Sequence, residues 1–89
     1  MPRVTTIEQL GEIIRRERKR RGLTQQELAD VCGVGINFIS SIERGKSSAE
    51  IGKVLHVVEV LGLVTVVEDR ATWNRISRYI ELDEGSRSS

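Results

Sequence analysis

Apolar residues recur every three or four positions through the first two-thirds of the chain, a spacing that places them on one face of an α-helix. Glycines interrupt this repeat at Gly22, Gly33, Gly45 and Gly62. Because glycine accepts the left-handed backbone conformation that ends many helices, these positions divide the segment into four predicted helices.

Residues that start helices stand at the expected places. Three pairs have the spacing of a capping box, in which a Ser or Thr stands three positions before a Glu: Thr5–Glu8, Thr24–Glu27 and Ser47–Glu50. They predict a first helix that ends at Gly22, a second over about 25–32 and a fourth through about Leu61. A short third helix begins at Gly35 or Ile36 and runs to about Glu43.

The helical repeat also predicts the core. Leu28 and Val31 of the second helix and Ile51, Val54, Leu55, Val58 and Leu61 of the fourth are expected to face inward. Ile7, Leu10, Ile13 and Ile14 of the first helix, and Ile36, Ile39 and Ile42 of the third, recur at helical spacing.

The pattern changes after Gly62. The run Leu63, Val64, Thr65, Val66 and Val67 is short and rich in β-branched residues, which predicts a strand. A single strand leaves its backbone groups unpaired, so we expect the same segment of a second copy to complete a two-stranded ribbon.

The last part of the sequence is less regular. Residues 70–82 fit a helical stripe through Trp73, Ile76 and Tyr79 better than a strand, although Ile76, Ile80 and Leu82 also fit a period of two. We expect a helix-turn-helix domain over 1–62, a dimerisation or partner-binding extension over 63–82 and a disordered tail over 83–89.

Composition narrows the classes of protein. With 89 residues there is room for one small domain, and the net charge is only +1. The charge is uneven, because residues 1–21 hold seven Lys or Arg and three Glu. One basic end suffices for phosphate binding. No run is long and apolar enough for a membrane helix, and no signal peptide is evident, so we expect a cytoplasmic protein.

Catalytic and metal-binding patterns are missing from the sequence. Cys32, the lone cysteine, fits a small buried position better than a redox switch, and His56 has no second ligand at metal-binding spacing. No nucleophile motif or phosphate-binding glycine loop occurs. We therefore expect no enzyme, no cofactor and no metal.

The motif that carries function lies between Thr24 and Lys46. It reads Thr-Gln-Gln-Glu-Leu-Ala, then Gly-Val, then Ile-Ser-Ser-Ile-Glu-Arg-Gly-Lys. With its flanks from Leu10 to Leu61, this stretch resembles the lambda-repressor-like, or xenobiotic-response-element, family of helix-turn-helix regulators. The strand after the last helix is similar to that of HipB-type antitoxins, which dimerise through such strands and bind a kinase-like toxin.

The resemblance implies roles for individual residues. The third helix enters the major groove of double-stranded DNA, with Ile36, Asn37 and Ser41 as candidates to contact bases. Candidates to contact phosphates are Gln25, Gln26, Ser40, Arg44 and Lys46. An ion pair between Arg18 and Glu43 is expected to join the first and third helices. Phe38 departs from the small polar residue common at its position, and we expect it to be half-buried.

The sequence thus predicts an all-α helix-turn-helix bundle of four to five helices, with a short C-terminal strand that pairs across a homodimer. The predicted function is a repressor that binds an inverted-repeat operator, as the antitoxin of a HipA-kinase-type operon. The alternative is a protein-binding adaptor that uses the same fold without DNA contact.

Overall fold

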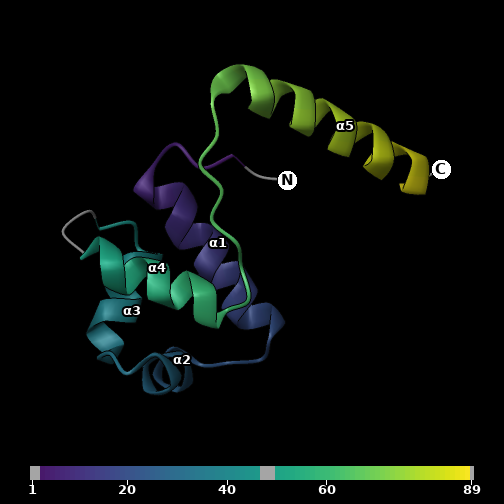
Figure 1. Cartoon of the computed structure of the whole chain (residues 1–89). Coiled ribbons are helices and arrows are strands. Elements are labelled where there is room, and N and C mark those ends of the chain that lie inside the picture. Colours follow the sequence, from purple (N-terminus) through teal and green to yellow (C-terminus); the bar gives the residue numbers. More distant parts are fainter. Residues whose placement is uncertain (1–2, 47–49, 89) are drawn as a thin grey trace.

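The chain is built from helices throughout the residues that the structure describes, which are 3–46 and 50–88 of this computed structural model. Five helices follow one another: α1 (Ile7–Arg20), α2 (Gln25–Cys32), α3 (Ile36–Glu43), α4 (Ile51–Val60) and α5 (Arg70–Ser88). The first four gather into one body, and α5 stands apart from it (Figure 1). No helix within the described ranges is both long and apolar enough to cross a bilayer.

Helix α1 begins one residue later than the sequence predicts. Its N-cap is Thr6, whose hydroxyl accepts a hydrogen bond from the backbone N–H of Gln9 at 3.1 Å. The Gln9 side-chain oxygen accepts from the backbone N–H groups of Thr5 and Thr6 at 2.6 and 3.1 Å. The predicted Thr5–Glu8 box is therefore wrong, because a glutamine amide serves as well as a carboxylate in this motif.

Helix α2 starts and stops where the sequence predicts. Thr24 and Glu27 form a complete capping box, and Gly33 ends the helix in the left-handed conformation with φ of 70°. Leu28 is fully buried, but Val31 is 65% exposed, so its predicted inward orientation is wrong. A helix of eight residues buries a narrow stripe, here Leu28, Ala29 and Cys32, and Val31 lies outside it.

Helix α4 also starts later than predicted. Its N-cap is Glu50, which makes no side-chain capping hydrogen bond, so Glu50 does not close a capping box. Ser47, the other half of that predicted pair, lies outside the described residues. The buried face of α4 also differs from the predicted one. Val54, Val57 and Val58 are buried, whereas Ile51 and Leu55, predicted to face inward, are exposed.

One aliphatic core joins the four helices. Its fully buried members come from every helix of the body: Ile14, Leu28, Ala29, Ile39, Ile42, Val57 and Leu61. Helix α3 packs between α1 and α2, and α4 packs against α2. Because α3 is held on two sides, only one of its faces is left for contacts outside the body.

The segment after Gly62 joins no strand in the single chain, although the backbone N–H of Leu63 donates to the Val58 carbonyl at 3.1 Å. No strand occurs in the described ranges, and residues 63–69 form a loop between α4 and α5. Val64 and Val67 are 83% and 93% exposed. A ribbon between two copies cannot form in one chain, so the predicted pairing stays a prediction.

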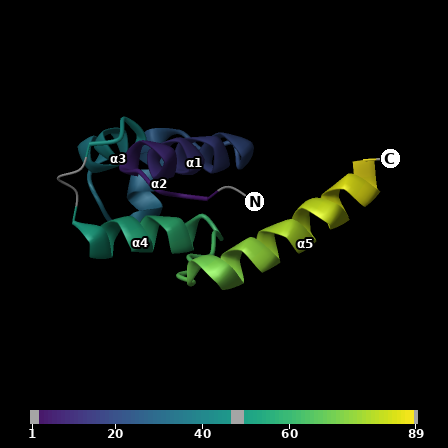
Figure 2. The ribbon, with the colours of Figure 1, turned by 90° about the horizontal axis from the view of Figure 1, so that it is seen from above.

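Helix α5 covers the region where residues 70–82 were expected to be helical, and it continues to Ser88. The helix thus includes residues 83–88, where a disordered tail was expected over 83–89, and Ser89 lies outside the described residues. Seen from above, α5 points away from the four-helix body (Figure 2).

Candidate nucleic-acid interface

Helices α2 and α3, joined by a tight turn at Gly33, present the candidate binding surface. Asn37 is exposed and Ile36 is 40% exposed, while Ser40 and Ser41 are half-buried. The opposite side of α3, with Ile39 and Ile42, is fully buried. The structure therefore brings the three predicted base-contacting residues, Ile36, Asn37 and Ser41, onto the accessible side of one short helix.

A close contact between backbones fixes the depth at which α3 packs. A Cβ atom on Gly11 of α1 would collide with the backbone carbonyl oxygen of Ile42 and would lie 3.2 Å from that of Glu43. Only glycine allows α1 and α3 to approach this closely.

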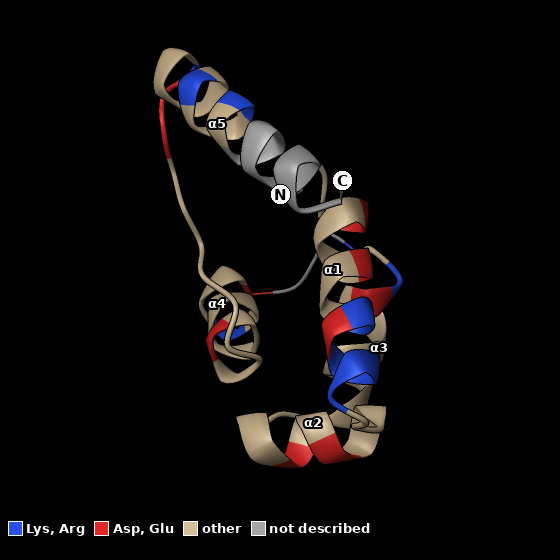
Figure 3. Ribbon diagram, turned by 90° about the vertical axis from the view of Figure 1, so that its right-hand side faces the viewer, with Lys and Arg blue, Asp and Glu red and all other residues tan. Residues whose placement is uncertain are grey.

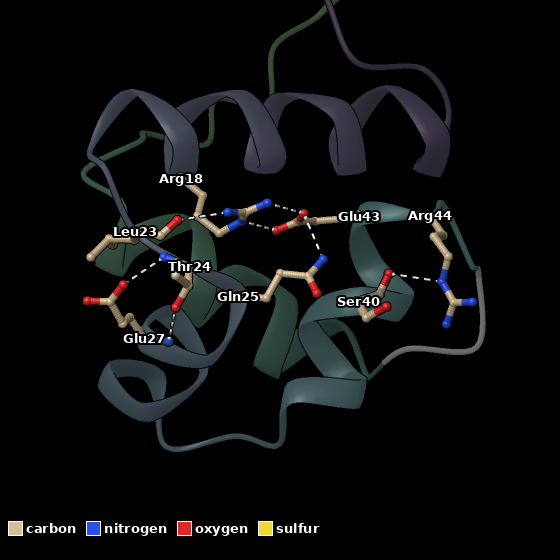
Figure 4. Close-up of polar contacts among 8 residues, drawn as sticks. All are labelled: Arg18, Leu23, Thr24, Gln25, Glu27, Ser40, Glu43 and Arg44. Atoms are coloured by element: carbon tan, nitrogen blue, oxygen red, sulfur yellow. Dashed lines mark hydrogen bonds and ion pairs between the residues drawn. The ribbon is translucent and has the colours of Figure 1, made fainter.

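Three side chains tie the ends of α1, α2 and α3 together (Figure 4). The Arg18 guanidinium donates to both carboxylate oxygens of Glu43, from Nε at 2.7 Å and from Nη2 at 3.0 Å. The Gln25 amide donates to Glu43 Oε1 at 3.2 Å. The expected pair of Arg18 and Glu43 is thus present, with a further partner from α2.

This ion pair is largely removed from water. The side chains of Arg18 and Glu43 are 9% and 3% exposed, and Arg18 Nη1 also donates to the Leu23 carbonyl at 2.7 Å. The hydrogen bonds that Arg18 donates to Glu43 raise the pKa of Arg18 above its usual value. A bidentate, shielded pair of this kind holds one relative orientation of its helices.

The predicted phosphate-contacting residues are more scattered. Gln25 and Gln26 are the first two residues of α2, and the Gln26 amide donates to Asp30 at 2.8 Å. Arg44 follows α3 directly and its Nε donates to the Ser40 carbonyl at 3.3 Å. Lys46 is exposed two residues further on. Because Gln25 contacts Glu43, the last residue of α3, the groups Gln25, Ser40, Arg44 and Lys46 gather toward the C-terminal end of α3.

One cation beside α3 was missed by the sequence analysis. Lys53 of α4 places its ammonium nitrogen 5.9 Å from the centre of the Phe38 ring. Phe38 packs partly against the core, as expected for a half-buried residue. Nothing in the local spacing of α4 indicates this contact, because it depends on how α4 crosses α3.

Positive charge concentrates in the second half of α1, whereas α2 carries acidic residues (Figure 3). Part of this charge is internally paired: Glu17 accepts hydrogen bonds from Arg20 at 2.6 Å and from Arg21 at 3.1 Å. Its contacts with Arg20, and then with Arg21, lower the pKa of Glu17 to about 2. Glu17 therefore stays charged and offsets part of the basic surface.

Cys32 and His56 take the positions expected of structural residues. Cys32 is buried, and burial raises the pKa of its thiol, which lowers its reactivity. His56 is exposed on α4. Among the residues that the structure describes, no group of three His, Cys, Asp or Glu side chains could hold a metal ion.

The comparisons with known proteins identify the domain. Residues 14–68 match the family model HTH_3, described as helix-turn-helix. The chain belongs to this helix-turn-helix family. The regulator is also 48% identical, over 60 residues, to the uncharacterized HTH-type transcriptional regulator y4mF of Sinorhizobium fredii, a match that covers 67% of this chain and 79% of that protein. It is thus a helix-turn-helix transcriptional regulator of the lambda-repressor-like type.

Solved structures share its fold. The regulator superposes on a chain of the HipA-HipB-O2-O3 complex with a TM-score of 0.72, and on a chain of the HipB-O4 20mer complex with a TM-score of 0.71. In each case sequence identity is 23%, and the match covers 79% of this chain and 99% of the other. The helical arrangement is therefore similar to that in these solved structures.

Proposed function

We propose that this regulator is a homodimeric repressor that binds an inverted-repeat operator and, as an antitoxin, also binds a kinase-like toxin encoded in the same operon. The observation that carries the proposal is the accessible polar face of α3, held in place by the Arg18–Glu43–Gln25 contacts. An adaptor that binds only protein would be expected to expose an apolar third helix instead.

Base recognition is assigned to α3. The major groove admits one α-helix and presents a different set of donors and acceptors for each base pair. The exposed amide of Asn37 suits the N6 and N7 atoms of adenine, Ile36 suits a thymine methyl group, and Ser41 can serve several bases.

Phosphate contacts are assigned to groups near the C-terminal end of α3. Gln25 and Gln26 stand at the start of α2, where unpaired backbone N–H groups favour an anion. Ser40 lies in the second half of α3, and Arg44 and Lys46 follow its last residue, Glu43, which the Gln25 amide contacts. Such contacts orient a protein on the duplex and carry no sequence information of their own.

Dimerisation is assigned to residues 63–67. Val64, Val66 and Val67 are exposed in the single chain, and neither helix nor strand is assigned to residues 63–69. Pairing this segment with its copy would satisfy the unpaired backbone groups and cover the valines. Two α3 helices would then lie about 34 Å apart and reach successive major grooves.

The antitoxin role is supported by the likeness to HipB, which was solved together with HipA and operator DNA. Its test is co-expression with the product of the adjacent gene. If that product is kinase-like, we expect both proteins to co-purify as a complex of defined mass. An adjacent protein that elutes separately would remove the antitoxin role and leave the repressor.

DNA recognition is tested by comparing Asn37→Ala with Lys46→Ala on the upstream region of the gene and on random DNA of equal length. Asn37→Ala should weaken binding to the upstream region by about 1–3 kcal/mol and barely change binding to random DNA. Lys46→Ala should weaken both alike. An equal loss on both DNAs for Asn37→Ala would contradict base reading, and no binding by the wild type would favour the adaptor.

A further inference from the structure

Phe38 and Lys53 form a contact beside α3 that the proposed function does not use. Phe38 directly follows Asn37 in the chain and departs from the small polar residue that the family resemblance leads us to expect there. Its ring packs partly against the core, and the Lys53 ammonium nitrogen lies 5.9 Å from the ring centre. The aromatic ring thus makes a contact with a cation that a small polar side chain could not make.

The position of Phe38 around α3 shows where Lys53 lies relative to the accessible face. At about 3.6 residues per turn, the residues on this side follow one another around the helix in the order Ser40, Asn37, Ser41 and Phe38. Arg44 belongs to the Ser40 edge, because its Nε donates to the Ser40 carbonyl. The Phe38 ring and the ammonium group beside it therefore mark the opposite edge.

A helix that lies in the major groove has a phosphate backbone on each of its two sides. Ser40 and Arg44, on one edge of α3, are already assigned to phosphates. The Phe38 edge is the one that would face the second backbone, and it is there that α4 places the cation of Lys53.

Lys53 can exchange its present partner for a phosphate. Its ammonium nitrogen lies 3.6 Å from Glu50 Oε2, and the side chains of Lys53 and Glu50 are 54% and 73% exposed. An ion pair this open to water is weak. A DNA phosphate, whose charge is reinforced by its neighbours along both strands, would displace Glu50.

We infer that Lys53 contacts a DNA phosphate beside the major groove, and that the Phe38 ring holds the ammonium group in position for this contact. The inference rests on the proposed entry of α3 into the major groove. It gives α4 a part in DNA binding, and it gives Phe38 a positioning role in place of base contact.

Salt dependence tests the phosphate contact. Lys53→Ala should weaken binding to the upstream region of the gene and to random DNA of equal length alike. It should also reduce the slope of log affinity against log salt concentration by about 0.9 for each protomer. Arg20→Ala is the control, because this arginine is paired with Glu17 and its loss should leave the slope unchanged.

Substitutions of Phe38 test the positioning role. Phe38→Leu keeps an apolar side chain but removes the ring, and it should weaken DNA binding about two- to fivefold, whereas Phe38→Tyr keeps the ring and should bind like the wild type. In a protein that already carries Lys53→Ala, Phe38→Leu should cause no further loss. A full further loss in that double variant would show that Phe38 acts independently of Lys53 and would overturn its positioning role. Circular dichroism confirms that each variant is folded at the temperature of the assay.

The outcomes separate this inference from the proposed function. If the wild type binds the upstream region but Lys53→Ala leaves the salt slope unchanged, the inference is overturned and the proposed function stands. A loss for Lys53→Ala on the upstream region alone would indicate a base contact and would also overturn it. A wild type that binds neither DNA would remove the proposed function and this inference with it.

Discussion

At the scale of single residues, Glu43 links three helices through one side chain. One carboxylate at the end of α3 receives Arg18 from α1 and Gln25 from α2. The side chain is 3% exposed, so its charge has little access to water. A charge in such a place is tolerated only while its partners stay in position.

Removal of the Arg18 side chain should therefore be costly. Arg18→Ala leaves the buried Glu43 carboxylate without its main partner, which should lower the free energy of unfolding by about 3–5 kcal/mol. Urea denaturation followed by circular dichroism measures the loss. Arg20→Ala, which breaks the solvent-exposed contact with Glu17, is the matched control and should change stability little. Similar losses for both variants would show that the Arg18 pair adds no special stability.

At the scale of elements, the contact of α1 with α3 depends on one glycine. Gly11 faces the backbone carbonyls of Ile42 and Glu43, whereas Gly52 of α4 has open space around its Cα atom. Both glycines lie within helices, so alanine changes the helix propensity at each. Only at Gly11 does it also disturb a close contact between helices, and comparing the two substitutions therefore separates the two effects on stability.

Substitution by alanine should have opposite effects on stability at the two sites. Gly11→Ala should push α1 away from α3 and destabilise the fold by about 1–3 kcal/mol. Gly52→Ala should stabilise it by up to about 0.5–1 kcal/mol, because alanine favours the helix. Thermal unfolding of both variants checks the signs, and a stabilised Gly11→Ala would show that the backbones are not in firm contact.

The elements also show what the sequence could predict. Capping residues located α2, and glycines located the C-terminal ends of α1 and α4, because these signals act over one helical turn. The orientation of Val31 and of the first turn of α4 could not be predicted. Each lies at the edge of a helical stripe, where burial depends on how neighbouring helices cross.

In the candidate site, too, one contact was predicted before the structure and others were not. The pairing of Arg18 with Glu43 came from the family resemblance, whereas the added contact of Gln25 required the structure. The contact of Lys53 with Phe38 joins two helices whose crossing geometry no local pattern encodes.

At the scale of the whole molecule, the distribution of charge matters more than its total. The net charge is only +1, because acidic residues in the later part of the chain cancel the basic first 21 residues. A protein of this kind can still bind a polyanion through one face while its other surfaces do not.

Salt dependence should reveal how many cations contact the DNA. Affinity for the operator should fall steeply with salt, and Arg44→Ala or Lys46→Ala should each reduce the slope of log affinity against log salt concentration by about 0.9. Arg20→Ala should leave the slope unchanged, since that arginine is already paired with Glu17. An unchanged slope for Arg44→Ala and Lys46→Ala would place both side chains away from phosphates.

The two-sided character of α3 has a consequence for how such proteins diversify. The side that fastens this helix to the body contains Ile39, Ile42 and Glu43, and the accessible side contains Ile36, Asn37 and Ser41. No residue belongs to both sets, so under the proposed assignment of α3 to base recognition a new target sequence could be acquired by exchanging the outer side chains while the anchoring ones are kept. Grafting three residues from a paralogue would then transfer its preference without redesigning the scaffold.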